Sequence, residues 1–151
     1  MNHKRYLFTL LLTLMVCATT YAQPSATNPK KKMNFLIHVT CGPENPTKAA
    51  LAFLVAKTAL DEGHIVSLFL AGDAAPLLKD AELDKVVGLG TGKLREHYEA
   101  IVKAGGKFYV SGMSAKARGM TEADIAGKPA ELAMPTVLVK LAAESDRMFT
   151  Y

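Results

Sequence analysis

The stretch MNFLIHVTCGPENP, residues 33–46, decides the fold of this chain. Its first seven residues form an almost unbroken run of strand formers, which is typical of a strand buried in a parallel sheet. The Gly-Pro pair ends that run, and Pro46 suits the first turn of a helix. Apolar residues then recur with helical spacing until Gly63. The sequence therefore predicts a buried strand followed by a helix that packs on the sheet.

The alternation of strands and helices continues to the end of the chain. Further strands are expected over residues 65–70, 107–110 and 147–150. Helical segments are expected over residues 75–79, 94–104, 115–118, 122–125 and 135–144. Strands that alternate with helices pair in parallel through right-handed crossovers. The expected fold class is therefore α/β, with the three layers of a helix–sheet–helix sandwich.

The first 22 residues have the order of a secretory signal. Lys4 and Arg5 form a basic head, residues 6–16 are uncharged and mostly apolar, and Thr20-Tyr21-Ala22 places small residues where a signal peptidase reads. The apolar run is shorter than the roughly 20 residues that span a bilayer. We expect cleavage after Ala22, a periplasmic or secreted protein, and no stable membrane span after processing.

The mature chain is then expected to have two parts. Residues 23–32 combine Pro, Ser and Asn with three lysines and predict a flexible linker. Residues 33–151 form one domain by length. Two alternatives to cleavage stay open, which are an uncleaved membrane anchor and lipidation of Cys17.

Charge and cysteine content narrow the possible functions. The chain has 18 basic and 14 acidic residues, and loss of the signal would leave 16 and 14. This balance is too mild and too scattered to indicate a nucleic-acid-binding protein. After cleavage Cys41 would be the single cysteine, so no intramolecular disulfide could form. Its thiol is then either buried and inert or exposed and reactive.

The first candidate site is the loop of residues 40–47. Ligands of parallel sheets bind beyond the carboxyl ends of the strands, and this loop follows such an end. Cys41 and Gly42 stand just ahead of a helix start, where free N–H groups would stabilise a thiolate. Cys41 is therefore a candidate nucleophile. The alternative is a small, partly buried thiol without chemistry.

The second candidate site is the loop of residues 111–118. Ser111, Gly112, Ser114 and Arg118 supply two hydroxyls, a glycine that lets the backbone approach a ligand, and a cation. A small anion would suit this set. The alternative is plain capping of the following helix by Ser114.

Other polar residues have weaker interpretations. Asp73 follows the second strand and could meet a ligand or cap the next helix. His38 and His64 could bind a metal, but their spacing matches no ligand pattern, so neither a metal nor a cofactor is predicted. Residues 88–92, GLGTG, lack the context of a nucleotide motif and are interpreted as a flexible connection. His97 is expected in solvent.

An ordered set of segments resembles the DsrE/DsrF-like family of small sulfur-handling proteins. The segments are TCGPENP at 40–46, EGH at 62–64, LAGD at 70–73 and SGMSAKARG at 111–119. The resemblance implies a five-stranded, mostly parallel sheet and assembly into trimers or hexamers. In members that relay sulfur, a cysteine at the end of the strand before the Arg-Gly segment carries a persulfide. Ser111 stands at that position here.

The resemblance thus implies a homo-oligomer. Its expected role is binding or accessory, because the hydroxyl of Ser111 cannot carry persulfide sulfur. The expected ligand is a small sulfur species or small anion. The expected ligand-binding residues are Gly42, Asp73, Ser111, Gly112, Ser114 and Arg118. One alternative is a thiol-dependent sulfurtransferase or redox enzyme with Cys41 as its catalytic residue. A second is a scaffold whose loops bind nothing.

Overall fold

The computed structural model of the protein describes residues 31–151, so the predicted signal and most of the predicted linker lie outside the described residues. The strands are β1 (Asn34–Val39), β2 (Ile65–Leu70), β3 (Val87–Gly88), β4 (Gly92–Lys93), β5 (Lys107–Ser111), β6 (Ala130–Ala133) and β7 (Arg147–Thr150). The α-helices are α2 (Pro46–Asp61), α3 (Asp80–Lys85), α4 (Leu94–Lys103), α5 (Gly112–Ala117) and α6 (Pro135–Glu144). Two 3₁₀ helices complete the set, η1 (Gly72–Leu78) and η2 (Glu122–Ile125).

Five strands form one parallel sheet in the order β6-β5-β2-β1-β7. The two most apolar strands, β1 and β2, hold central places and pair from Asn34–Ile65 to Val39–Leu70. The parallel α/β fold expected from the sequence is therefore confirmed. The carboxyl ends of all five strands meet at one edge, as parallel pairing requires.

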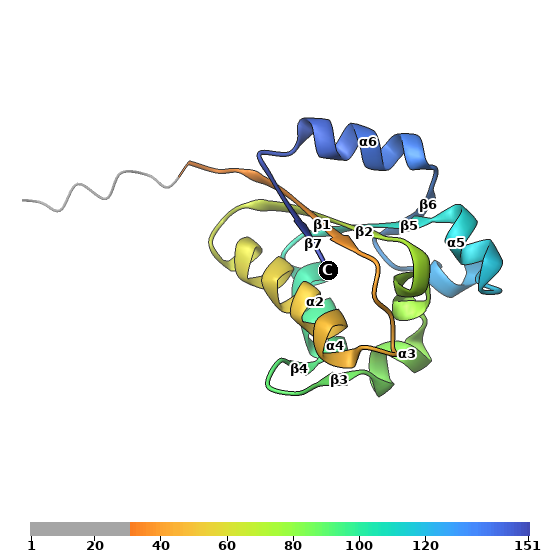
Figure 1. Ribbon diagram of the computed structural model, residues 1–151. Coiled ribbons are helices and arrows are strands. Elements are labelled where there is room, and N and C mark those ends of the chain that lie inside the picture. The colour runs from red at the N-terminus through yellow and green to blue at the C-terminus, as the bar shows by residue number, and fades with distance from the viewer. Residues whose placement is uncertain (1–30) are drawn as a thin grey trace, which may run out of the picture. The chain divides into compact units, whose positions relative to one another are not determined.

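The two faces of the sheet are covered unequally. Helices α2 and α4 lie on one face and α6 lies alone on the other (Figure 1). The main core fills the α2 and α4 side, where Phe53, Leu68 and Phe108 are fully or almost fully buried. Only a small cluster around Leu36 and Phe69 lies under α6, which has no fully buried residue of its own.

Helix α2 begins where its sequence predicts. The side chain of Asn45 accepts a hydrogen bond from the backbone N–H of Lys48 at 3.2 Å, and Pro46 opens the first turn. Asn45 thus satisfies one of the N–H groups that a helix start leaves free. Small alanines on the buried face let the helix lie close to the sheet.

The structure differs from the expected elements in the type of some segments, and it contains elements that the sequence did not predict. Residues 75–79, expected as a short α-helix, belong to the 3₁₀ helix η1 instead, which contains Pro76. Strand β6 and helix α3 were not predicted. Ala130 and Glu131 are poor strand formers, so β6 depends on its pairing with β5 rather than on local preference.

The glycine-rich residues 88–92 are not a flexible connection. They form the turn of a small antiparallel hairpin between β3 and β4. Thr47 at the start of α2 holds it, because its hydroxyl accepts from the N–H of Leu89 at 3.0 Å. His97 is part-buried rather than solvated, and its Nε2 lies 2.5 Å from the carbonyl oxygen of Thr91.

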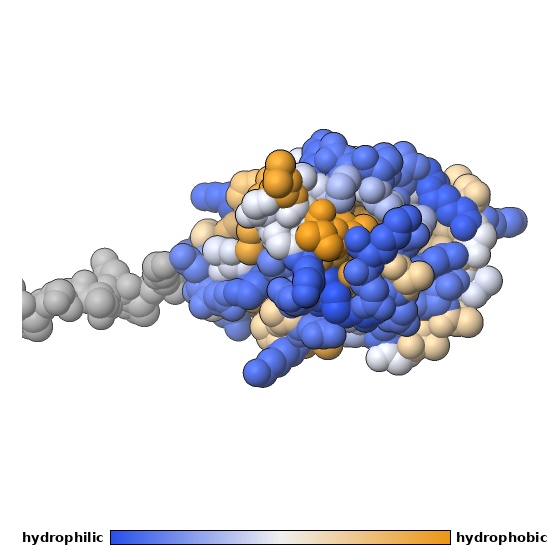
Figure 2. All heavy atoms as spheres, turned by 90° about the horizontal axis from the view of Figure 1, so that it is seen from below, coloured by the Kyte–Doolittle hydropathy of each residue, from blue (hydrophilic) through white to orange (hydrophobic). Residues whose placement is uncertain are grey.

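The hairpin exposes two apolar side chains to solvent. The side chain of Leu89 is 89% exposed and that of Val87 is 54% exposed. Figure 2 views this side, and small orange patches stand out there from a largely hydrophilic surface. None of the helices within residues 31–151 is long and apolar enough to cross a membrane.

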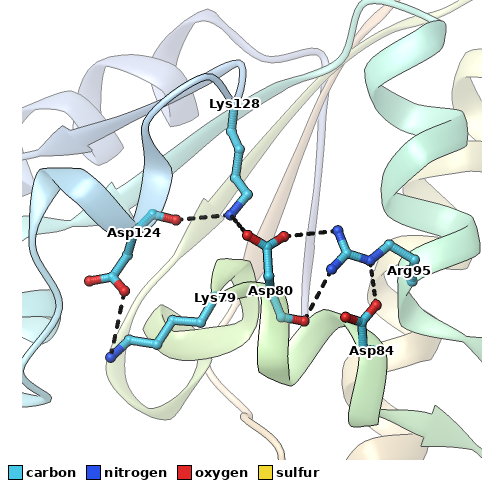
Figure 3. A network of polar contacts seen from close by, with 6 residues as sticks. All are labelled: Lys79, Asp80, Asp84, Arg95, Asp124 and Lys128. Carbon is cyan, nitrogen blue, oxygen red and sulfur yellow. Dashed lines mark hydrogen bonds and ion pairs between the residues drawn. The ribbon is translucent and has the colours of Figure 1, made fainter.

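Ion pairs join α3 to α4 and to the segment before β6 (Figure 3). The carboxylate of Asp80 accepts from Arg95 at 3.0 Å and from Lys128 at 3.1 Å, and Arg95 also donates to Asp84 at 2.7 Å. A further pair links Lys79 with Asp124 at 3.9 Å. Asp80 is the centre of this network.

Replacement of Asp80 by Asn should lower the melting temperature at neutral pH. The hydrogen bonds from Lys128 and Arg95 hold the pKa of Asp80 below its ordinary value. Its stabilisation is therefore present above the unfolded-state pKa of about 3.9 and is lost as the pH falls through the folded-state pKa. Thermal unfolding from pH 7 to pH 2 should show the two proteins converging at the acid end.

The matched control is Asp61→Asn, which removes one carboxylate from an isolated surface pair with Lys57. Such pairs contribute little, so this variant should melt close to the parent protein. An equal drop in melting temperature in both variants would contradict the stabilising role of the network. So would a drop in Asp80→Asn that persists at low pH.

Candidate functional site

Three loops meet at the carboxyl edge of the sheet, after β1, β2 and β5. An added Cβ on Gly42 would lie 2.0 Å from the carbonyl oxygen of Asp73, so the first two loops are in direct backbone contact. The N–H of Gly72 donates to Ser114 Oγ at 2.9 Å, which joins the second loop to the third. The structure thus brings the two predicted loops together through the LAGD segment of residues 70–73.

Ser111 and Ser114 form a hydroxyl pair at the end of β5. Their Oγ atoms lie 3.1 Å apart, and Ser111 Oγ also accepts from the backbone N–H of Ser114 at 3.4 Å. Ser111 is therefore the N-cap of α5, and the alternative interpretation of Ser114 as the cap is wrong. The Oγ of Ser114 instead accepts a hydrogen bond from the N–H of Gly72.

One hydroxyl hydrogen of the pair has no acceptor among the described residues. Ser111 and Ser114 each have one hydroxyl hydrogen, and only one of the two is used in the bond between them. Within the described residues no hydrogen bond accounts for the other hydrogen. A group of about 9% exposure thus keeps a donor that a ligand atom could use.

Arg118 is already engaged. Its guanidinium forms an ion pair with the carboxylate of Asp73 at 2.5 Å and donates to the carbonyl oxygen of Ser114 at 3.4 Å. Asp73 consequently does not cap η1, whose N-cap is Ala71. The pair ties the second loop to the third and leaves little net positive charge between them.

Cys41 lies in the same cluster of loops but is poorly suited to be a nucleophile. The residue is partly buried and packs against the main core. Burial raises the pKa of its thiol above the ordinary value, and the positive charge of Lys48 opposes this only in part. This shift is opposite to the one that a reactive thiolate needs.

A sequence model of the DsrE/DsrF-like family matches residues 33–151. The chain belongs to the DsrE/DsrF-like family. The match covers all five strands of the parallel sheet and all three loops. No curated protein is significantly similar to the chain in sequence.

Solved structures of low sequence identity share the fold of this DsrE/DsrF-like domain. The YchN protein from E. coli superposes with a TM-score of 0.63 at 14% identity, over 79% of this chain and 99% of that one. A conserved protein of unknown function, BT1422 from Bacteroides thetaiotaomicron, gives a TM-score of 0.57 at 9% identity, over 78% of this chain and 94% of that one. At such identities the comparison concerns the fold alone.

The two histidines do not come together as a metal site. Nδ1 of His64 lies 3.4 Å from the N–H of Met33, and its ring stacks on Phe35. His38 is on the α6 side beside Phe69, and burial lowers its pKa. Within residues 31–151, no group of three or more His, Cys, Asp or Glu side chains is placed to hold a metal ion.

Sequence reasoning missed the polar groups that shape the first loop. Glu44 turns back and accepts from the N–H of Gly42 at 2.7 Å. Thr40 donates its hydroxyl to the carbonyl oxygen of Tyr151 at 2.7 Å. The Glu44 bond is local and its spacing could have suggested it, whereas the Tyr151 bond joins residues 111 positions apart and had no local signal.

Replacement of Gly42 by Ala should destabilise the protein by about 1–3 kcal/mol, the usual cost of overpacking. The new methyl group would overlap the Asp73 carbonyl, which is backbone and cannot rotate away. Urea unfolding measures the loss. Gly112→Ala is the matched control, because a Cβ there meets only the Ala133 carbonyl oxygen, at 3.7 Å. Equal stability of the two variants would show that the loops do not pack as described.

Alkylation of Cys41 should be slow at neutral pH. Since burial raises the pKa of this thiol, the reaction rate should rise mainly above the free-thiol pKa of about 8.5. The experiment uses iodoacetamide on a Cys17→Ser chain, with mass spectrometry to locate the label and glutathione as the reference thiol. Fast labelling near pH 6 would contradict this description and would favour the alternative of a thiol-dependent enzyme.

Proposed function

We propose that this DsrE/DsrF-like protein is an exported, small homo-oligomeric protein that binds a small sulfur species or small anion at the carboxyl edge of its sheet. Its role is binding or accessory rather than persulfide relay. The residues proposed to surround the ligand are Gly42, Asp73, Ser111, Gly112, Ser114 and Arg118.

The observation that carries the proposal is the spare hydroxyl hydrogen of the Ser111–Ser114 pair. Water or an acceptor atom of a ligand can take this hydrogen bond, and its position beside three loops favours a small ligand with an acceptor atom. Gly112 helps, since no side chain from that position blocks the approach. Ser111 lies at the strand end where relay members of the family have their cysteine, which points to a shared binding position with different chemistry.

Charge favours a weakly charged ligand. Arg118 is neutralised by Asp73, and Glu44 adds a second carboxylate in the neighbouring loop. A dianion such as phosphate would meet these carboxylates, whereas a monoanion such as hydrosulfide would meet less repulsion. This argument favours a small sulfur species over a general phosphate site.

The thiol-enzyme alternative receives less support. Cys41 would need a lowered pKa to attack a sulfur compound, and burial raises it. Ser111 cannot replace it, because within the described residues no general base is hydrogen-bonded to its hydroxyl. A binding role needs neither group to react.

Export and self-association are supported by different features. The basic head, short apolar run and small residues before Gln23 support secretion and cleavage after Ala22. Self-association into a trimer or hexamer is supported by the family resemblance. An accessory protein outside the cytoplasm fits a chain with a single mature cysteine of low reactivity.

Ser111→Ala should weaken binding of hydrosulfide about tenfold, the effect of losing one hydrogen bond to a charged ligand. Isothermal titration measures this on protein expressed from the full sequence, whose mass also reports whether residues 1–22 have been removed. Ser145→Ala is the matched control, because Ser145 bonds only the Leu141 carbonyl and follows α6, outside these loops. Absence of binding by the parent protein, or equal affinity in Ser111→Ala, would sink the proposal.

A further inference from the structure

One side edge of the sheet is open. Strand β7 pairs only with β1 among the described strands, and all four of its residues are exposed. Met148 is 43% exposed and Phe149 is 41% exposed. An edge of this kind presents unpaired backbone groups and is a template for another strand.

The register shows which backbone groups point outward. Phe149 pairs with Ile37, and the N–H of Tyr151 donates to the carbonyl oxygen of His38 at 2.9 Å, so Phe149 and Tyr151 turn their backbone groups toward β1. Because these groups alternate along a strand, the N–H and C=O of Met148 and Thr150 point away from the sheet. The open edge therefore offers two donors and two acceptors, placed evenly about Phe149.

We propose that β7 pairs with β7 of a second copy of the chain, antiparallel and with the two-fold axis at Phe149. Met148 of each copy then faces Thr150 of the other, and these two residues exchange both of their hydrogen bonds. Both copies together make four such bonds and no outward group is left over. The sheets of the two copies join into one. This deepens the self-association proposed above, because a two-fold contact of this kind joins two trimers into a hexamer and is absent from a trimer. It does not depend on the ligand.

The side chains of β7 fit a second copy. Phe149 stacks on Phe35 with ring centroids 5.9 Å apart, beside an apolar groove of about 350 Å³ between α2 and β7. In the two-fold pair the Phe149 rings of both copies would lie side by side over their grooves, as directly opposed residues do. The contact thus extends beyond the backbone bonds.

Charge also permits this register. Arg147 is the only charged residue of β7, and in the proposed pair it lies opposite Tyr151 rather than opposite the second Arg147. Like charges do not meet, and a cation can approach an aromatic ring. Lysines, which commonly protect open edges from pairing, do not occur in β7.

A disulfide tests the register directly. In a chain with Cys17→Ser and Cys41→Ser, Phe149→Cys places two thiols at a non-hydrogen-bonded antiparallel pair, where Cα atoms are about 4.5 Å apart and a disulfide can form. Oxidation with diamide should convert most of this variant to a covalent dimer on a non-reducing gel. Thr150→Cys in the same background is the control, since its two thiols are two residues out of register and should not link.

Assembly in solution supplies the second test. Met148→Pro removes an outward N–H without touching the bonds to β1, and Met148→Lys with Thr150→Lys sets like charges against each other across the axis. Analytical ultracentrifugation should show either variant at half the mass of the parent, with the circular dichroism of a folded protein. Val139→Glu, on the exposed side of α6, should keep the parent mass.

A monomeric or trimeric parent, equal linking at positions 149 and 150, or parent mass in both β7 variants would overturn the inference. Dissociation by Val139→Glu alone would place the contact on α6 instead. Hydrosulfide titration of the two β7 variants separates this inference from the ligand proposal, because loss of the two-fold contact with retained binding leaves the ligand proposal unaffected.

Discussion

The parallel pairing of β1 with β2 is the constraint on which the rest of the structure depends. It forces α2 to cross over the sheet, and it sends the ends of both strands to the same edge. The loops that follow are then so close that only a residue without a side chain fits at position 42, against the Asp73 carbonyl. The third loop joins them through Ser114 and Gly72. The candidate site is thus a consequence of strand order and is completed by two long-range contacts.

The fold was predictable where buried segments have a clear apolar pattern in the sequence. β1 and β2 are apolar runs, since the sheet buries both of their faces, and α2 has its cap and proline in place. β6 could not be predicted in this way, because Ala130–Ala133 has little intrinsic strand preference. Its extended conformation depends on pairing with β5. The hairpin was misjudged for a related reason. Its glycines suggest a flexible backbone, but hydrogen bonds to Thr47 of α2 and His97 of α4 hold the hairpin in place.

The site was predictable in position but not in its bonding. Strand ends identify Cys41 and Ser111, because ligands of parallel sheets gather there. The polar groups of the site are paired through two long-range contacts. Gly72 and Ser114 are 42 positions apart, and Asp73 and Arg118 are 45 positions apart, so no local sequence pattern predicts either contact. Cys41 illustrates the limit further. A helix start favours a thiolate, yet packing against the core raises the pKa of this thiol, and only the packed structure shows which effect is larger.

Strand β1 connects the candidate site with the open edge. Its carboxyl end leads into Cys41 and Gly42, and its outer neighbour is β7. The backbone carbonyl of Tyr151, the residue after β7, accepts from both the N–H and the hydroxyl of Thr40, the residue before Cys41. A second copy bound along β7, as proposed, would therefore restrict the motion of Tyr151, which anchors the first loop, since fixing a strand also restricts the residue that follows it. The proposed assembly surface and the proposed ligand site are different, but one short path of hydrogen bonds connects them. That path passes through the backbone carbonyl of Tyr151, which is 111 positions from Thr40, too far for a local sequence pattern to reveal it.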